Sequence, residues 1–186
     1  MYGLTEYGGT HGDKQGGDGV VFSFDVGLAP FVRTVPTLRK VGKAVGILGG
    51  GLTGTSNVSF NGTSATFTVV SDTYLTATVP SEATTGVVTV TTPSGTLTSN
   101  QNFRVKPVIL SFSPTSGPAG TPVTITGNSL TQTIRVGFDW LKAASFTVNS
   151  DTQVTAVVPT GATTGRVQIR TMGGLAVSGG VFTVTQ

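Results

Sequence analysis

His11 is the only histidine in the chain of 186 residues, so it is the first residue to consider for catalysis or metal binding. It lies in the glycine-rich stretch GGTHGDKQGGDG, together with Asp13 and Asp18. A catalytic triad needs a nucleophile and an acid beside the histidine, and a histidine metal site needs further ligands. The two aspartates among glycines resemble a calcium-binding turn, but such a site needs about six oxygens at set positions. We interpret the stretch as a polar turn and expect neither a catalytic site nor a metal site.

Other residue types that support catalysis are scarce. Cysteine is absent, which excludes disulfide bonds, thiolate metal sites and a cysteine nucleophile. Only eight acidic residues could supply paired carboxylates for acid–base catalysis. Asp72 and Asp151 each lie in the tripeptide SDT, where a short carboxylate typically hydrogen-bonds nearby backbone. We therefore predict a protein that is not an enzyme and carries no cofactor.

Trp140 is the only tryptophan, and it follows Phe138 and Asp139 in a predicted loop. An exposed indole could stack on a sugar ring while the neighbouring carboxylate bonds a sugar hydroxyl. Alternatively, the indole covers its own domain as a lid or contacts a protein partner, because indole also buries well. The sequence leaves both interpretations open, and these three residues are the candidate glycan contacts.

The only basic cluster consists of Arg33, Arg39, Lys40 and Lys43. Such a cluster could bind nucleic acid, but no aromatic residues are interleaved with it. We interpret it as solvated surface or as a docking patch for another protein, and we expect no nucleic acid partner.

The elements that carry these residues occur twice. The stretch SDTYLTATVPSEATTGVVTV begins at Ser71, and SDTQVTAVVPTGATTGRVQI begins at Ser150. The offset between matched residues changes by one between the segments FNGTSA and FDWLKAA, and an insertion of this kind marks a surface loop. The sequence therefore predicts two copies of one domain, residues 29–106 and 107–186, with Trp140 in the loop that differs.

Each copy consists of short segments in which apolar residues alternate with polar ones. In the second copy such pairs include Val123 and Ile125, Phe146 and Val148, and Val167 and Ile169. A two-residue period is typical of a strand with one buried face. Proline and glycine separate the segments, as in PTSGPAG and PTGATTG, and no stretch has a helical period. The expected fold is all-β, with two small two-sheet sandwiches in tandem.

Three motifs of the second copy carry a resemblance to a known family: PVILSFSPTSGPAGTPVTITGNSL, SDTQVTAVVPTGATTGRVQI and GGVFTVT. On these motifs, residues 107–186 resemble an IPT/TIG domain, which has an immunoglobulin-like fold. Residues 29–106 resemble the same domain, with PTLRKVG in place of the turn PTSGPAG. The resemblance implies a sandwich without catalytic machinery. Its members occur in bacterial surface proteins, as accessory modules of sugar-processing enzymes, and in some eukaryotic receptors and transcription factors.

Residues 1–28 have a different character. The sequence MYGLTEYGGTHGDKQGGDGVVFSFDVG resembles one unit of the Gly- and Val-rich tandem repeats in exported proteins of acidobacteria. This resemblance implies an extracellular or cell-surface location in a bacterium. The first residues do not resemble an export signal, and no apolar run reaches the 18 or so residues of a membrane span, so direct membrane insertion is not expected.

One segment of residues 1–28 is a candidate assembly strand, and its alternating apolar residues are Val20, Phe22, Phe24 and Val26. A single repeat unit cannot bury such a face alone, and each buried side chain contributes about 1.5–3 kcal/mol. The strand could belong to a longer array, fold back on the first sandwich, or add to the sheet edge of a neighbouring molecule. Strand addition predicts head-to-tail self-association into a filament. The formal charges, −3 for residues 1–28 and +4 for residues 29–106, are complementary.

Taken together, the sequence favours an extracellular structural or adhesive protein that acts as a surface spacer or filament subunit. Its expected partners are copies of itself or other surface proteins. The alternative is a carbohydrate-binding accessory module of a larger secreted protein, with a glycan at Trp140.

Overall fold

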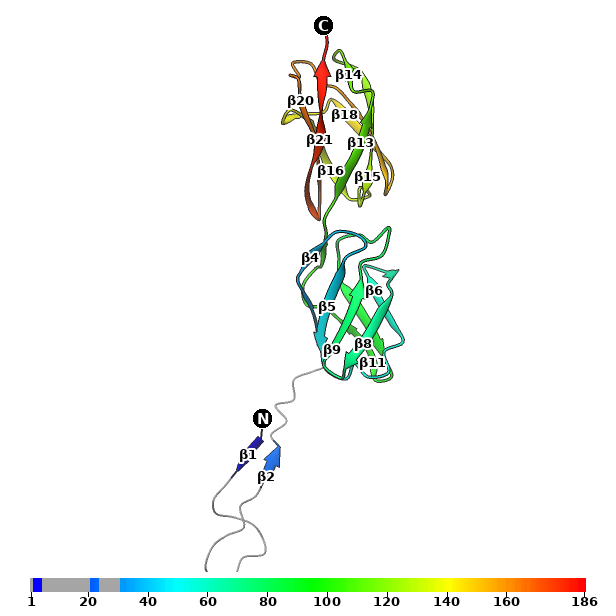
Figure 1. Cartoon of the computed structure of the whole chain (residues 1–186), viewed down its shortest axis with the longest axis vertical. Coiled ribbons are helices and arrows are strands. Elements are labelled where there is room, and N and C mark those ends of the chain that lie inside the picture. Colours follow the sequence, from blue (N-terminus) through cyan, green and yellow to red (C-terminus); the bar gives the residue numbers. More distant parts are fainter. Residues whose placement is uncertain (1, 5–20, 24–30) are drawn as a thin grey trace, which may run out of the picture. The chain divides into compact units, whose positions relative to one another are not determined.

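The computed structural model describes residues 2–4, 21–23 and 31–186. It divides into two units, Met1–Pro30 and Phe31–Gln186. Every regular element in the described residues is a β-strand (Figure 1), which confirms the all-β fold that the alternating sequence predicts.

In the first unit, β1 (Tyr2–Leu4) pairs with β2 (Val21–Ser23) in an antiparallel two-stranded sheet. Gly3 lies opposite Phe22 in this register. Phe22 is thus the one residue of the candidate assembly strand with a described backbone, whereas Val20, Phe24 and Val26 lie outside the described residues.

Residues 31–106 form the first sandwich. Its strands are β3 (Val32–Val35), β4 (Leu38–Arg39), β5 (Ala44–Gly49), β6 (Asn57–Phe60), β7 (Thr63–Ser64), β8 (Phe67–Ser71), β9 (Tyr74–Thr78), β10 (Val88–Thr92), β11 (Gly95–Thr98) and β12 (Arg104–Val105). One sheet has the order β3-β5-β9-β8 and the other has the order β11-β10-β6-β7. A short parallel pair joins β12 to β4.

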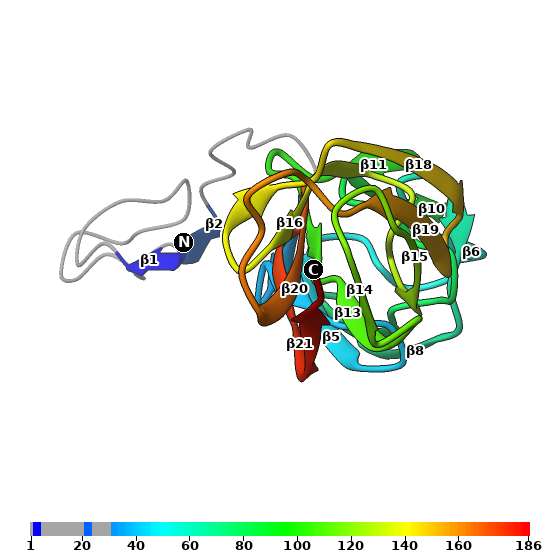
Figure 2. The ribbon, with the colours of Figure 1, turned by 90° about the horizontal axis from the view of Figure 1, so that it is seen from above.

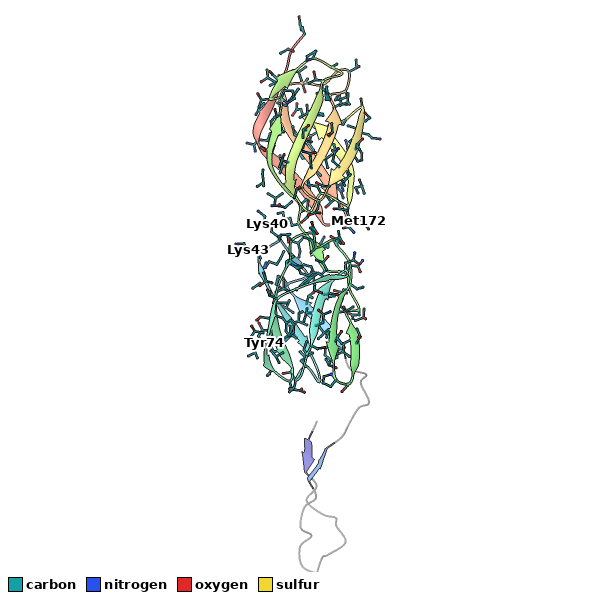
Figure 3. The ribbon with its side chains drawn as sticks, turned by 90° about the vertical axis from the view of Figure 1, so that its right-hand side faces the viewer. Lys40, Lys43, Tyr74 and Met172 are labelled. Carbon is teal, nitrogen blue, oxygen red and sulfur yellow. The ribbon has the colours of Figure 1, made fainter. Side chains whose placement is uncertain are left out.

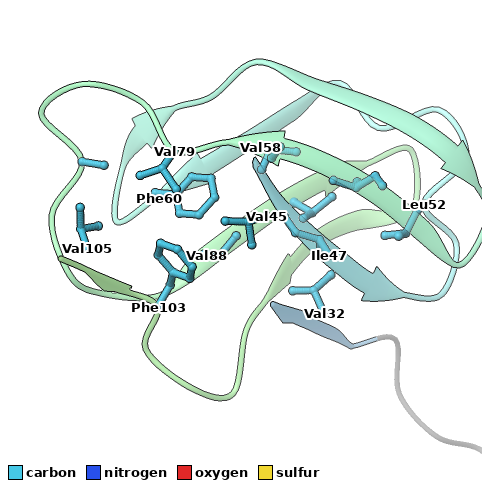
Figure 4. Packing of buried hydrophobic residues seen from close by; sticks show 14 residues of the cluster. Val32, Val45, Ile47, Leu52, Val58, Phe60, Val79, Val88, Phe103 and Val105 are labelled. Carbon is cyan, nitrogen blue, oxygen red and sulfur yellow. The ribbon is translucent and has the colours of Figure 1, made fainter. Parts of the chain in front are cut away.

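The core of this sandwich follows from the two-residue period. In β10, Val88 and Val90 are fully buried, whereas Thr89 and Thr91 are half-buried. Inward side chains of both sheets form one cluster (Figure 4), in which the rings of Phe60 and Phe103 meet edge to face with centroids 5.0 Å apart. Edge-to-face contact is a favourable arrangement for aromatic pairs.

Residues 107–186 form the second sandwich. Its strands are β13 (Val108–Ser113), β14 (Ser116–Gly117), β15 (Pro122–Asn128), β16 (Thr133–Phe138), β17 (Leu141–Lys142), β18 (Ser145–Ser150), β19 (Gln153–Val157), β20 (Gly165–Thr171) and β21 (Gly174–Val184). One sheet has the order β13-β15-β19-β18 and the other the order β14-β21-β20-β16-β17. Figure 2 shows β16 and β20 on one side of this sandwich and β15 and β19 on the other.

The second core repeats the first. Phe138 and Phe182 meet edge to face at 5.3 Å, in the places that Phe60 and Phe103 take in the first sandwich. The same pairs of sheets and the same aromatic contact confirm two immunoglobulin-like sandwiches in tandem.

Residues of the two sandwiches meet within the unit Phe31–Gln186. The side-chain amide of Gln132 donates from Nε2 to the carbonyl of Thr85 at 3.0 Å and accepts from the Thr85 amide at 2.8 Å. A Cβ on Gly173 would overlap the carbonyl oxygen of Val105, so only glycine fits there. These contacts connect the two domains through backbone groups.

Candidate functional site

The turn between β16 and β17 carries the chain's only tryptophan in a backbone conformation that tryptophan rarely adopts. Asp139 has φ 43° and Trp140 has φ 71°. The equivalent turn of the first sandwich is made by Asn61 at φ 47° and Gly62 at φ 93°. Asn-Gly is the preferred pair for a tight hairpin turn with two positive φ angles. A side chain other than glycine costs about 1–2 kcal/mol in this conformation, and such strain is concentrated at functional sites.

Two of the three candidate glycan contacts have structural roles in this turn. Phe138 is 1% exposed and packs in the core, so it offers no surface to a ligand. The Asp139 carboxylate accepts a hydrogen bond from Thr163 Oγ1 at 2.7 Å. Asn61 makes the corresponding bond to Thr84, also at 2.7 Å, so this contact belongs to the fold of both copies.

Trp140, in contrast, presents its side chain to solvent. It is 63% exposed, which does not agree with an indole that covers its own domain as a lid. Its backbone is held on both sides, because its amide donates to Gln168 Oε1 at 3.0 Å and its carbonyl accepts from Arg135 Nη2 at 2.9 Å. The indole is therefore exposed on an anchored backbone.

A shallow pocket of about 80 Å³ lies beside the indole on the outer face of the five-stranded sheet. Its lining residues are Arg135, Gly137, Trp140, Gln168, Arg170 and Leu175. They form two rows across the strands, because Arg135 lies opposite Arg170 and Gly137 lies opposite Gln168. Gly137 keeps the space open, since a Cβ there would come within 3.0 Å of Gln168 Oε1.

The pocket is basic. The four basic residues of the second sandwich all lie on strands of this sheet: Arg135, Lys142, Arg166 and Arg170. The two acidic residues of this sandwich are bound elsewhere, Asp139 to Thr163 and Asp151 to the loop at Ser129 and Thr131. Positive charge and one exposed indole thus share one face.

The first sandwich provides an internal comparison. Its equivalents of Arg135 and Arg170 are Asn57 and Thr91, which lie opposite each other in the same register. Its equivalents of Gly137 and Gln168 are Ser59 and Thr89, whose hydroxyls hydrogen-bond each other at 2.7 Å. The residues that line this pocket, and their charges, are therefore particular to the second copy.

The predicted docking patch is divided between two ends of the first sandwich. Arg33 lies opposite Leu48 in β5, whereas Lys43 precedes the other end of β5. Lys43 is five residues from Leu48 along the chain, and five strand residues span about 16 Å, so the side chains of Arg33 and Lys43 are far apart. Lys40 and Lys43 are near neighbours (Figure 3), since the Lys43 amide donates to the Lys40 carbonyl at 3.3 Å. Arg39, which precedes them, is also exposed.

The repeated aspartates cap loops, as their SDT context predicts. Asp72 accepts from the amides of Gly51 and Thr53, both at 3.2 Å. Asp151 accepts from the amides of Ser129 at 3.2 Å and Thr131 at 3.3 Å. The hydrogen bonds from Thr53 and Gly51 lower the pKa of Asp72, because they favour its charged form.

The described residues contain no group of three or more histidine, cysteine, aspartate or glutamate side chains that could hold a metal ion. His11 and its neighbouring aspartates lie outside them. No helix in the described part of the chain is long and apolar enough to cross a membrane.

The second sandwich matches a known domain family in sequence. Residues 107–184 match the model of the IPT/TIG domain family, which confirms the resemblance of the second copy. No curated protein matches the chain in sequence.

Several solved structures have a similar fold. A surface glycan-binding protein from Prevotella bryantii is 21% identical, with 83% of this chain and 42% of that chain covered and a TM-score of 0.52. A protein from a xyloglucan utilization locus of Bacteroides uniformis is 21% identical, with 83% and 49% covered and a TM-score of 0.39. The plexin A4 extracellular region is 20% identical, with 84% and 18% covered and a TM-score of 0.41. The chain spans less than half the length of each, and at these identities the likeness concerns the fold.

Sequence reasoning found Trp140 and missed Arg135, Gln168 and Arg170. A comparison of the two copies would have found them, because each is larger or more charged than its equivalent in the first sandwich. Their positions on one face follow from the period of the strands, but their register does not.

Proposed function

We propose that this chain is a carbohydrate-binding module, in which Trp140 is the stacking platform for a sugar ring. The observation that carries the proposal is that an exposed tryptophan takes a turn position that glycine holds in the duplicate domain. Strain of about 1–2 kcal/mol at this position needs a compensating benefit. Since most of the indole is exposed, packing within the domain is a small benefit, and contact with a ligand is the better explanation.

The surroundings of the indole support the proposal. An aromatic face binds the apolar face of a sugar, and polar groups at its edge bond the hydroxyls. Arg135, Arg170 and the Gln168 side chain line the pocket beside Trp140. The Gln168 and Arg135 bonds to the Trp140 backbone hold the platform before a ligand arrives, which lowers the entropy cost of binding.

The similar structures give this function a biological setting. The Prevotella bryantii protein of similar fold is a surface glycan-binding protein. We propose a corresponding location for this chain, at a cell surface or outside the cell, as an accessory part of a larger glycan-binding system.

A glycan array with the purified chain tests the proposal, with Trp140→Ala as the diagnostic variant. Loss of a central aromatic contact typically costs about 2 kcal/mol or more, which corresponds to about 30-fold in affinity. Leu110→Ala is the matched control, because Leu110 is 65% exposed and lies on the opposite sheet of the same sandwich. We expect the control to bind as the wild type does. Binding that survives Trp140→Ala would contradict this site, and an array without any specific glycan would contradict the function.

A second candidate function is self-association through the first unit, as a surface spacer, adhesive module or filament subunit. The observation that favours it is the β1–β2 pair, because a two-stranded sheet is marginally stable and no other strand among the described residues pairs with it. Electron microscopy and sedimentation of the full chain and of a chain without residues 1–28 test it. A full chain that stays monomeric at high concentration contradicts it. Arg39, Lys40 and Lys43 are the proposed docking patch in this case.

A further inference from the structure

We propose that the Trp140 pocket selects glycans that carry a carboxylate, such as those containing uronic acid residues. This inference rests on the proposed function, and it specifies the chemical class of the sugar. The pocket contains two guanidinium groups, Arg135 and Arg170, on one wall of a site whose platform is an indole.

The register of β16 and β20 places the two arginines together. Arg135 on β16 lies directly opposite Arg170 on β20. Directly opposed residues that share a sheet face have Cβ atoms about 4.5–5.5 Å apart, and like charges in such a pair repel each other. An anion between the two side chains converts this repulsion into attraction. The first sandwich, with Asn57 and Thr91 at the same register, has no such repulsion.

Further basic residues surround the arginine pair. The other basic residues of the second sandwich, Lys142 and Arg166, lie on the same sheet, so their positive charges add to those of the arginine pair. Asp139, next to Trp140 in the chain, keeps its negative charge while its carboxylate accepts from Thr163 Oγ1 at 2.7 Å. Four basic residues against two acidic ones leave residues 107–186 with a formal net charge of +2, and a positive field raises the local concentration of anionic ligands.

The geometry of the guanidinium group indicates the kind of anion. A planar guanidinium matches the two oxygens of a carboxylate and donates two parallel hydrogen bonds to them. Arg135 already donates from Nη2 to the Trp140 carbonyl, which fixes the guanidinium beside the indole. A pyranose ring stacked on Trp140 would direct a carboxylate on its rim toward this pair. Leu175, opposite Arg170 on β21, supplies an apolar wall to the same pocket.

A nucleic acid strand fits this site less well. Single-stranded nucleic acids bind along a groove with several aromatic side chains, each of which stacks a base. Among the described residues, Trp140 is the one aromatic residue that lines this pocket. One platform with an adjacent arginine pair suits one acidic ring.

The test compares binding of an oligogalacturonide with binding of the same oligosaccharide after chemical reduction of its carboxylates, by isothermal titration calorimetry with the full chain. We expect the acidic form to bind at least about tenfold more tightly, because hydrogen bonds to charged groups are the stronger ones. Arg170→Gln should lower the affinity for the acidic form much more than the affinity for the reduced form, so that the preference is lost. Arg170 is chosen because Arg135 also holds the Trp140 backbone. Arg104→Gln is the matched control, since Arg104 is exposed on β12 of the first sandwich.

The outcomes separate the two proposals. Equal affinity for the acidic and reduced forms would overturn the carboxylate preference and leave the carbohydrate-binding function in place. No affinity for either of them, or for any neutral glycan, would overturn both. Equal affinity for the oligogalacturonide, a sulfated glycan and a single-stranded oligonucleotide would show a general polyanion surface and overturn the inference. Preference for the carboxylated form that depends on Arg170 and is unaffected by Arg104→Gln supports it.

Discussion

Replacement of Trp140 by glycine should stabilise the protein while it removes glycan binding. The backbone of Trp140 has φ 71°, and relief of this conformation returns about 1–2 kcal/mol. Glycine costs about 0.4–1 kcal/mol because it gives the unfolded chain more freedom. The indole is 63% exposed, so little buried apolar area is lost with it. The expected balance is a gain of up to about 1 kcal/mol, which raises Tm by about 2–4 °C.

The first sandwich supplies the reciprocal variant. Gly62 has φ 93°, and a Cβ added to it would meet no atom within 4 Å. Gly62→Ala therefore isolates the backbone cost of the turn and should destabilise the protein by about 1 kcal/mol. Thermal and urea unfolding of both variants, followed by glycan titration of each, complete the experiment. We expect opposite signs in stability, with binding lost in Trp140→Gly and retained in Gly62→Ala.

One result would refute this reasoning. If Trp140→Gly lowers the free energy of unfolding by more than about 1 kcal/mol, the indole stabilises its own sandwich. The occurrence of tryptophan at a positive φ would then have a structural explanation, and the main argument for a ligand would be lost.

Three further predictions concern the framework. The hydrogen bonds that Asp72 accepts lower its pKa below the ordinary value of 3.8. The charged carboxylate therefore stabilises the fold at pH values above 3.8, and this stabilisation is lost as the pH falls through the lower pKa of the folded state. Asp72→Asn should thus lower Tm at neutral pH and change it less in acid, and an equal change at both pH values would contradict this assignment. Gln132→Ala removes both side-chain bonds to the Thr85 backbone, so amide hydrogen exchange at Thr85 should become faster, and unchanged exchange would show that these bonds do not persist in solution. Ser178→Ala should lower the free energy of unfolding by about 1–3 kcal/mol in urea titrations, because the buried hydroxyl bonds two backbone groups. It accepts from the Val167 amide at 3.0 Å and donates to the Gly180 carbonyl. An unchanged free energy of unfolding would mean that water replaces the hydroxyl.

The sequence predicts the framework well because the framework depends on local patterns. Alternation in segments such as Val123 to Ile125 determines which face of a strand is buried, and both of these residues are fully buried. The duplication predicts two equivalent cores, and the Phe60–Phe103 and Phe138–Phe182 contacts confirm it.

The candidate site was predicted only in part because it depends on contacts between strands. The partner of Asp139 is Thr163, which is 24 residues away in the sequence, so a structural role for this carboxylate could not be recognised locally. The pairing of Arg135 with Arg170 depends on the register of β16 against β20, and β16 contains a bulge that shifts it. Trp140 itself was identifiable, because it is unique and stands where the first copy has Gly62.

The most direct test of the account uses the fluorescence of Trp140. Because this is the only tryptophan in the chain, its emission reports on one site without a label. Titration of the full chain with the oligosaccharide selected on the array should change the emission with a saturable dependence on ligand concentration, and Leu110→Ala should give the same curve. A ligand that binds by calorimetry without any change in Trp140 emission would contradict the account, because the sugar would then occupy another surface.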